Sequence, residues 1–463
     1  MKLVWAFGLL LIFLIGSCHA VDDVVAAAPS EKQKVTVSGD KHDGEGGHDH
    51  AHHIPHRVHN EEEESWVQGF VWNMVGYLII IIPASFLIRM VKNSNFKEQG
   101  GQGKWYQLLT CCIFGNEASP TGNKRSIFPC LSGDTTTATA IKLATCTIGL
   151  QVSYLTWGVL QEKVMTHKYG EGTQAVKFKN SEFLVFMNRI AAFIVAGLYI
   201  QITRSGQWNG PFYRFSFASL SNICSSWCQY EALRFVSFPT QVLGKASKMI
   251  PVMIMGRVVS KKTYQYYEYV VALMISVGVS LFLTATGSDK HNSTETTVSG
   301  LILMIGYMGF DSFTANWQSH MFTEYKVPSM QMMFNVNCFS CLFTSVPLLI
   351  SGGMTYALAF MMVHPSFATH VGIISLTSVT GQMFIFYTLA EFGPLVFTTI
   401  MVTRNMLSIL LSCIIYGHVL TSQAALGVSV VFCALFLQIY AKYRIKQKKS
   451  QQVTNPREQS DMA

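Results

Sequence analysis

Ten apolar runs follow one another between residues 138 and 440, and they constrain this chain more than any other feature. Each has about 20 residues, the length that an α-helix needs to cross a bilayer. Charged residues make up 13% of the chain, whereas a soluble domain carries about 25%. An ordinary soluble enzyme and a disordered protein are therefore excluded. The runs lie at about 138–160, 183–203, 212–233, 236–258, 264–286, 298–317, 330–350, 371–390, 394–416 and 419–440.

The chain ahead of these runs carries a targeting segment and one more apolar run. A basic start, an apolar stretch to residue 15 and small residues up to Ala20 predict a signal peptide, residues 1–20, with an uncleaved anchor as the alternative. Residues 21–65 hold seven of the 14 histidines, a composition typical of a flexible tail or of loose zinc binding. The run 66–90 predicts an extra transmembrane helix, and residues 91–137 a cytosolic linker.

Basic residues predict the orientation of the spans. The linker and the tail at 441–463 are both rich in lysine and arginine, so both are expected in the cytosol. Alternate threading then puts the loop 288–297 in the lumen, where Asn292 lies in the single N-x-S/T sequon of the sequence. The loop 161–182 is expected in the lumen too. Its four lysines are contrary to the rule that basic residues favour cytosolic loops. We expect a luminal, glycosylated Asn292.

The runs fall into two sets of five, within residues 138–287 and 298–440. A shift of 157 residues brings four identical pairs into register: Gln161 with Gln318, Thr166 with Thr323, Tyr230 with Tyr387 and Phe235 with Phe392. Because five is odd, the second set is inverted relative to the first, which is a common transporter architecture with its site at the midplane. The predicted fold is an all-α polytopic membrane protein with a ten-helix core of two inverted five-helix repeats, plus one extra N-terminal transmembrane helix.

Three basic residues lie deep inside predicted spans. Lys245 and Lys248 are the tenth and thirteenth residues of the fourth core run, and Arg404 is the eleventh of the ninth run. Lysines so far from a helix end cannot extend to the interface, and each central cation costs about 2.5–3.5 kcal/mol on insertion scales. At spacing i, i+3 the two lysines share one helix face, and Gln241 extends this stripe. A polar cavity or a counter-charge is therefore expected beside them.

Acidic partners for these cations are scarce. Asp311 lies inside the sixth core run, whereas Glu231 and Glu391 lie near run ends. A structural salt bridge would neutralise one cation, and an anionic ligand accounts for the others, because guanidinium and ammonium groups together are typical of phosphate binding. Amides and aromatic rings of the same spans either pack in the core or contact a base and a sugar: Gln161, Gln229, Tyr230, Asn316, Gln382 and Tyr387.

Motifs of other mechanisms do not occur in the sequence. It contains no G-x-x-x-x-G-K-S/T loop for ATP, no G-x-S-x-G elbow and no H-E-x-x-H metal motif. No catalytic residue, metal site or cofactor is predicted. The sequence therefore favours a secondary transporter over an enzyme.

The stretch from Ser221 to Gly256, which contains both lysines, closely resembles nucleotide-sugar transporters of the drug/metabolite transporter superfamily. Supporting stretches are 151–162, 310–318 and 411–418. Within this family the chain is similar to Golgi transporters of 3′-phosphoadenosine 5′-phosphosulfate (PAPS). The resemblance implies an antiporter that brings PAPS from the cytosol into the Golgi lumen, with an adenosine nucleotide as counter-substrate. It also implies that Lys245, Lys248 and Arg404 contact phosphate.

Other functions stay open at this point. A transporter of another nucleotide sugar or nucleotide anion is the nearest alternative. A zinc transporter would use the histidine-rich segment, but it would need histidine or carboxylate ligands inside the spans. A membrane-bound transferase and a receptor that transports nothing are the remaining alternatives, and a monomer and a homodimer both fit the sequence.

Overall fold

A computed structural model describes most of the region predicted to cross the membrane. The described residues are 75, 77–78, 81–94, 110, 112–114, 136–170, 176–178, 180–203, 209–236, 244–245, 247–286, 298–415 and 422–460. The chain divides into two units, residues 1–67 and 68–463, and every described residue belongs to the second unit. The predicted signal peptide, histidine-rich segment, Gln241 and Asn292 lie outside the described residues.

The described residues are mostly helical, as the apolar runs predict. The first set of helices is α4 (Thr136–Thr166), α5 (Ser181–Ile202), α6 (Arg214–Phe235), α8 (Met249–Ser260) and α9 (Tyr266–Thr286). The second set is α10 (Val298–Glu324), α11 (Ser329–Ile350), α12 (Gly353–Val363), α13 (Pro365–Ile415) and α14 (Ser422–Ser460). Among these residues, five helices are long and apolar enough to cross a membrane: α4, α5, α10, α11 and the first 40 residues of α13.

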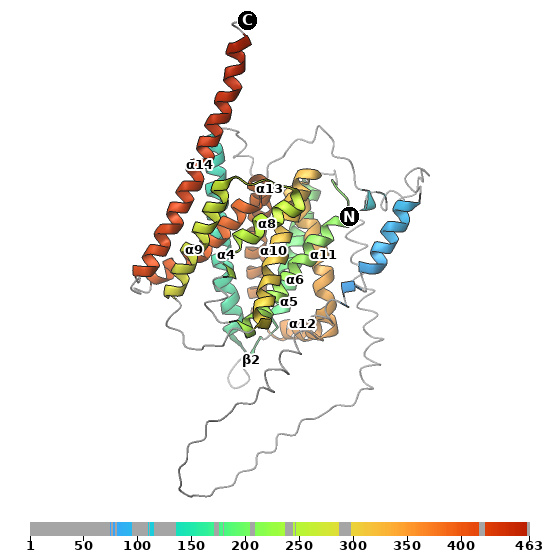
Figure 1. Ribbon diagram of the computed structural model, residues 1–463. Helices are drawn as coiled ribbons and strands as arrows, with labels where there is room; N and C mark the ends of the chain where they lie inside the picture. Colours follow the sequence, from blue (N-terminus) through green and yellow to red (C-terminus); the bar gives the residue numbers. More distant parts are fainter. Residues whose placement is uncertain are drawn as a thin grey trace, which may run out of the picture. The chain divides into compact units, whose positions relative to one another are not determined.

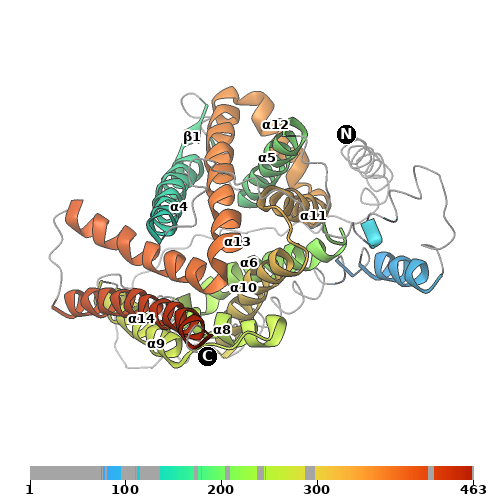
Figure 2. The same cartoon turned by 90° about the horizontal axis from the view of Figure 1, so that it is seen from above.

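Helix α13 covers two of the predicted runs and bends between them. Gly393 interrupts its helical backbone at φ 80° and ψ 177°, a conformation that glycine adopts at little cost. Pro394 follows and lacks the backbone N–H that would continue the helix. The break falls between the runs 371–390 and 394–416, and Figure 2 shows the two halves of α13 running in different directions.

The predicted span 236–258 is not one uninterrupted helix among its described residues. Residues 244, 245 and 247 are helical and Lys248 is a turn residue at the N-cap of α8. Pro251 falls in the first turn of α8, where its missing N–H leaves no hydrogen bond unmade. Lys248 itself has helical backbone angles (φ −53°, ψ −26°), and the expectation that Lys245 and Lys248 share one helix face stays a prediction.

Two small elements were not expected from the apolar runs. Strands β1 (Lys168–Tyr169) and β2 (Val176–Lys177) pair antiparallel between α4 and α5. Helix α12 begins after Gly352, which has φ 67°, and at 11 residues it is too short to cross a bilayer. Tyr169 joins these elements, because its hydroxyl lies 3.1 Å from Nδ1 of His370 in α13 and its ring 5.8 Å from that of Phe360 in α12.

The helices of the two sets pair with one another. Helix α4 packs against α13, α6 against α10, α5 against α11 and α9 against α14. Helix α8 also contacts α10, α5 contacts α13, and α6 contacts α11. Figures 1 and 2 show α9 beside α14 and α6 beside α10. Each close pair thus joins one helix of the first set to one of the second.

Apolar side chains cover the outside of this bundle and polar side chains lie inside it. Ile148, Val152 and Val159 of α4 are 63%, 59% and 68% exposed, so one face of α4 is apolar and suited to lipid. In contrast, Asn316 and Asn337 are fully buried. An apolar exterior around a polar interior is what a membrane protein with an internal polar site requires.

The segment before α4 also reaches the bundle. Residues 81–93 are helical, within the run predicted as an extra transmembrane helix. The ring of Tyr77 lies 5.8 Å from that of Phe343 in α11, and Nζ of Lys92 donates to the hydroxyl of Tyr213 at 2.9 Å. This segment therefore contacts α11 and the start of α6.

A cationic candidate site inside the helix bundle

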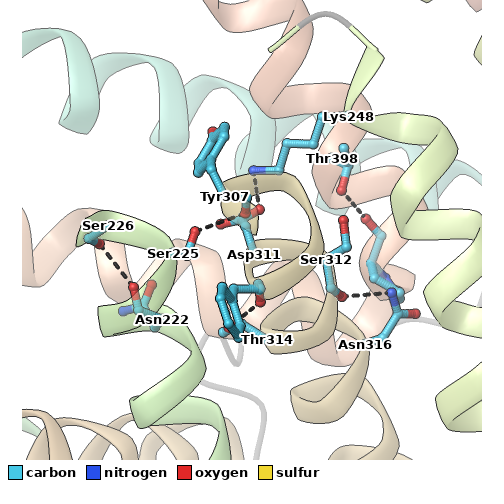
Figure 3. Close-up of polar contacts among 12 residues, drawn as sticks. Asn222, Ser225, Ser226, Lys248, Tyr307, Asp311, Ser312, Thr314, Asn316 and Thr398 are labelled. Carbon is cyan, nitrogen blue, oxygen red and sulfur yellow. Dashed lines mark hydrogen bonds and ion pairs between the residues drawn. The ribbon is translucent and has the colours of Figure 1, made fainter. Parts of the chain in front are cut away.

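The first element of the site is an ion pair between Lys248 and Asp311. Asp311 is the fourteenth of the 27 residues of α10 and so lies at its middle. Nζ of Lys248 contacts Oδ2 of Asp311, and it also lies 6.0 Å from the centroid of the Tyr307 ring, one turn earlier on α10. Figure 3 shows the lysine reaching across to α10. The sequence analysis expected one cation to be neutralised by a structural salt bridge, and Lys248 forms such a bridge.

Hydrogen bonds fix α10 to its neighbours at this level. The hydroxyl of Ser225 in α6 donates to the carbonyl oxygen of Tyr307 at 3.2 Å, and that of Ser221 to Phe310 at 2.7 Å. Nδ2 of Asn316 donates to the carbonyl oxygen of Val252 in α8 at 2.9 Å. The carboxylate of Asp311 is therefore held on a helix that is tied to both α6 and α8.

The second element is Arg404, which lies over the ring of Tyr154. Cζ of Arg404, in the second half of α13, is 5.3 Å from the ring centroid of Tyr154 in α4, a cation–π arrangement. The Tyr154 ring also packs against Gly381, where an added Cβ would come within 3.0 Å of it. Trp157 follows on α4, with its ring 6.2 Å from that of Tyr154.

Lys245 lies in the same electrostatic field. Its charge interacts with those of Lys248 and Arg404, and Lys248 in turn interacts with Arg404. All three side chains are half-buried. The structure therefore brings together the three cations that the sequence singled out, although Arg404 is far from the two lysines in the chain.

A fourth cation, Arg189, was missed by the sequence analysis. It is the ninth of the 22 residues of α5, near the middle of the helix. Its electrostatic partners are Tyr154, Tyr230 of α6 and Cys341 of α11. The signal was present in the sequence, because Arg189 is the one charged residue in the run 183–203.

The other residues predicted at the site have different surroundings. The fully buried Asn316 ties α10 to α8 with its amide nitrogen. Gln382 is buried, and its Oε1 accepts a hydrogen bond of 2.9 Å from Nδ2 of Asn337 in α11. Tyr387 is buried and Tyr230 is 57% exposed. Gln161 and Gln229 are half-buried, and their contact with a substrate stays a prediction.

A further ion pair joins the two sets of helices away from these cations. Nζ of Lys142 in α4 lies 3.3 Å from Oε1 of Glu391, two residues before the break in α13. Lys142 is buried, whereas the Glu391 side chain is 42% exposed. This pair links α4 to α13 and gives Glu391 a structural partner.

Basic side chains collected inside a bundle of apolar helices are typical of a membrane transporter for anions. The model of the UAA transporter family matches residues 142–442, so the chain belongs to this family. The nucleotide-sugar transporter family predicted from the sequence is thereby confirmed, and with it the expectation of a transporter in place of an enzyme.

Three relatives illustrate the range of similar proteins. "Adenosine 3′-phospho 5′-phosphosulfate transporter 1" of Homo sapiens is 50% identical over 403 residues, which cover 85% of this chain and 93% of that protein. The protein of the same name from Drosophila melanogaster is 42% identical, covering 82% and 84%. "UDP-galactose/UDP-glucose transporter 5B" of Arabidopsis thaliana is 36% identical, covering 66% and 89%.

Proposed function

We propose that this protein is a secondary transporter that carries PAPS from the cytosol into the Golgi lumen, where PAPS supplies sulfotransferases. The observation that carries the proposal is the excess of positive charge in the site. Among the residues that the structure describes at the site, Lys245, Lys248, Arg404 and Arg189 supply four positive charges and Asp311 one negative charge. An anionic substrate is needed to balance them.

The charge of the substrate favours PAPS over a UDP-sugar. A phosphate monoester carries about −1.5 to −2 charges at neutral pH, so PAPS, with a 3′-phosphate and a 5′-phosphosulfate, carries about −4. A UDP-sugar has only the two charges of its diphosphate. The four cations of the site suit the four negative charges of PAPS better than the two of a UDP-sugar. Relatives named for PAPS transport are also more similar to this chain, at 50% and 42% identity, than the relative named for UDP-sugars, at 36%.

The architecture proposed for this function is a core of two inverted five-helix repeats. The helix pairs support it, because exchanging the two sets leaves the list of pairs unchanged. Counted by apolar runs, the second set omits the short α12, and α13 supplies its third and fourth helices. The first helix of each set then packs against the third of the other set (α4 with α13, α10 with α6), the second helices pair (α5 with α11), and the fifth helices pair (α9 with α14). Rocking of the two repeats about the cations would open the site alternately to each side of the membrane. The helical segment around residues 81–93 would be the extra transmembrane helix.

We further propose obligatory exchange with an adenosine nucleotide. An empty site must carry its excess positive charge through a closed, dry intermediate, and desolvation and mutual repulsion make this passage slow. A bound nucleotide supplies the missing negative charge in both directions. The return step would then need a nucleotide as well, which makes the protein an antiporter.

The experiment is uptake of radiolabelled PAPS, UDP-galactose and UDP-glucose into liposomes that contain the purified protein. We expect uptake of PAPS, and competition by adenosine 3′,5′-bisphosphate. Lys168→Ala, which removes an exposed lysine of β1 away from the four cations, serves as the matched control and should behave as the wild type. Uptake of a UDP-sugar without uptake of PAPS would replace the proposal by its nearest alternative.

A further inference from the structure

Two further cations lie at the end of the bundle where the helical segment 81–93 meets α6. Nζ of Lys92 donates to the hydroxyl of Tyr213 at 2.9 Å and lies 4.9 Å from the centroid of the same ring. Cζ of Arg214, the first residue of α6, lies 5.2 Å from the ring centroid of Tyr325, which directly follows α10. These are cation–π arrangements. Each of the two cations therefore contacts a tyrosine ring at the same end of the bundle.

Apolar side chains on both elements indicate how deep these cations lie. Every fourth residue along one face of the segment 81–93 is apolar and 60–69% exposed: Ile82, Phe86 and Met90. Lys92 lies two residues beyond this lipid-facing stripe, or about 3 Å along the helix axis. On α6, the exposed Phe217 lies one turn after Tyr213, and their ring centroids are 6.4 Å apart. Lysine, arginine and tyrosine at the end of a lipid-facing stretch are typical of the headgroup level of a bilayer.

The surrounding backbone holds Arg214 and Tyr325 in place. Nε1 of Trp317 in α10 donates to the carbonyl oxygen of Arg214 at 2.9 Å. Gly210, just before α6, has φ 77°, and an added Cβ there would lie 2.9 Å from the Tyr325 ring. The ring thus packs directly on the backbone of this loop. Arg214 and the tyrosine that it contacts are therefore positioned by α10 and by the chain just before α6.

The charges at this end of the bundle leave a positive excess. In the part of the chain that the structure describes, neither Lys92 nor Arg214 forms an ion pair with a carboxylate. Glu324 and Lys326 flank Tyr325, and both are exposed and opposite in charge. The ammonium group of Lys92 has three hydrogen-bond donors, and Tyr213 accepts from one of them. The two cations can therefore bind an anion.

We propose that Lys92 and Arg214 bind the phosphate-bearing headgroup of an anionic phospholipid, whose acyl chains lie along Phe217 and the apolar stripe of the segment 81–93. Charge complementarity and the position at headgroup level support a lipid as the ligand. Anionic lipids of the cytoplasmic leaflet attract basic residues, and basic pockets between transmembrane helices bind phosphoinositide headgroups. The predicted cytosolic linker begins at this end, at residue 91.

The chemistry of the two cations suits a phosphate that bridges them. A guanidinium can bind phosphate through two parallel hydrogen bonds, and an ammonium group adds a compact charge. A phosphate contacted by both would tie the segment 81–93 to α6 and so hold this helix on the bundle. The inference goes beyond the proposed function, because it does not depend on which substrate is carried.

The test is binding of phosphatidylinositol 4-phosphate, phosphatidylserine and phosphatidylcholine to the purified full-length protein in detergent, measured by native mass spectrometry. We expect the wild type to bind the phosphoinositide most tightly and phosphatidylcholine least. Lys92→Gln and Arg214→Gln should each weaken binding of the phosphoinositide about fivefold, since one basic residue near a membrane surface contributes about that much. Lys168→Gln is the matched control, because it removes an exposed lysine of β1, and it should keep the wild-type affinity.

Three results would overturn the inference. Equal binding of phosphatidylcholine would reduce the two cations to ordinary anchors at the membrane surface. Wild-type affinity for the phosphoinositide in the double variant would remove both residues from a lipid site. Displacement of the lipid by adenosine 3′,5′-bisphosphate, with weaker binding of that nucleotide in the double variant, would make this a nucleotide site. If Arg214→Gln does not fold, Lys92→Gln decides, because its side chain is exposed, and an unchanged affinity there contradicts the proposal.

Discussion

Replacing Asp311 by asparagine should strengthen nucleotide binding. Asp311 neutralises Lys248 in the empty site, so a substrate phosphate that approaches Lys248 meets repulsion from this carboxylate. An asparagine side chain at this position would have nearly the same shape without the charge. The substitution therefore tests whether the carboxylate competes with the substrate or positions the lysine for it.

The size of the effect follows from the charges and their exposure. Two unit charges about 4 Å apart interact by about 4 kcal/mol at an effective dielectric constant of about 20. A phosphate on the far side of the Lys248 ammonium lies about twice as far from Asp311, which gives a repulsion of about 2 kcal/mol. The two side chains are 17% and 26% exposed, so water lowers this to about 1.4 kcal/mol, or about tenfold in affinity.

The assay is calorimetric titration of adenosine 3′,5′-bisphosphate into the wild type and Asp311→Asn. Glu391→Gln is the matched control, because it removes the carboxylate of the other ion pair, with Lys142, and should leave affinity unchanged. We expect binding about tenfold tighter in Asp311→Asn, with slower exchange, since an empty site with one more net positive charge returns more slowly. Weaker or unchanged binding in a correctly folded variant would refute the reasoning, because Asp311 would then position Lys248.

Four other outcomes follow from the site and the fold. Lys248→Ala or Arg404→Ala should abolish PAPS uptake while the protein still reaches the Golgi, and wild-type uptake would remove the argument for an anion site. Liposomes preloaded with adenosine 3′,5′-bisphosphate or AMP should take up PAPS faster than liposomes with buffer alone, and equal initial rates would make the protein a uniporter. Gly149→Ala should lower the free energy of unfolding by about 1–3 kcal/mol, measured by thermal unfolding, because its Cβ would lie 2.5 Å from the Phe384 ring. Gly158→Ala, where an added Cβ meets open space, is the control and should leave stability unchanged. Asn292→Gln should increase gel mobility by the loss of one glycan. An epitope after residue 442 should be accessible from the cytosol, and accessibility only after permeabilisation of Golgi membranes would reverse the predicted orientation.

The helices could be predicted from the sequence because hydrophobic length is a local property. Most of the apolar runs fall on helices, although α14 continues well beyond its run. The break at Gly393 falls where two runs meet, since glycine and proline act on the backbone around them. Pro251 falls in the first turn of α8, where proline is tolerated, and not in a helix interior. A run of hydrophobic residues does not reveal where the backbone within it stops being helical.

The partners of the site residues could be predicted only in part. Lys248 and Asp311 were both noticed as ionisable groups inside spans, but their contact depends on how α8 and α10 are rotated, which no local pattern encodes. The amide nitrogen of Asn316 bonds to the backbone of α8, and its expected contact with the substrate stays a prediction. Arg189 escaped notice as a lone charge in an apolar run, and only the packing of α5 beside Tyr154 gives it a role.

The most direct test of the account is an experimental structure of this protein with adenosine 3′,5′-bisphosphate bound. We predict that the phosphates of the nucleotide lie within hydrogen-bond distance of Lys245, Lys248 or Arg404. A nucleotide bound elsewhere, with these three side chains contacting only protein, would contradict the claim that the buried cations select the substrate.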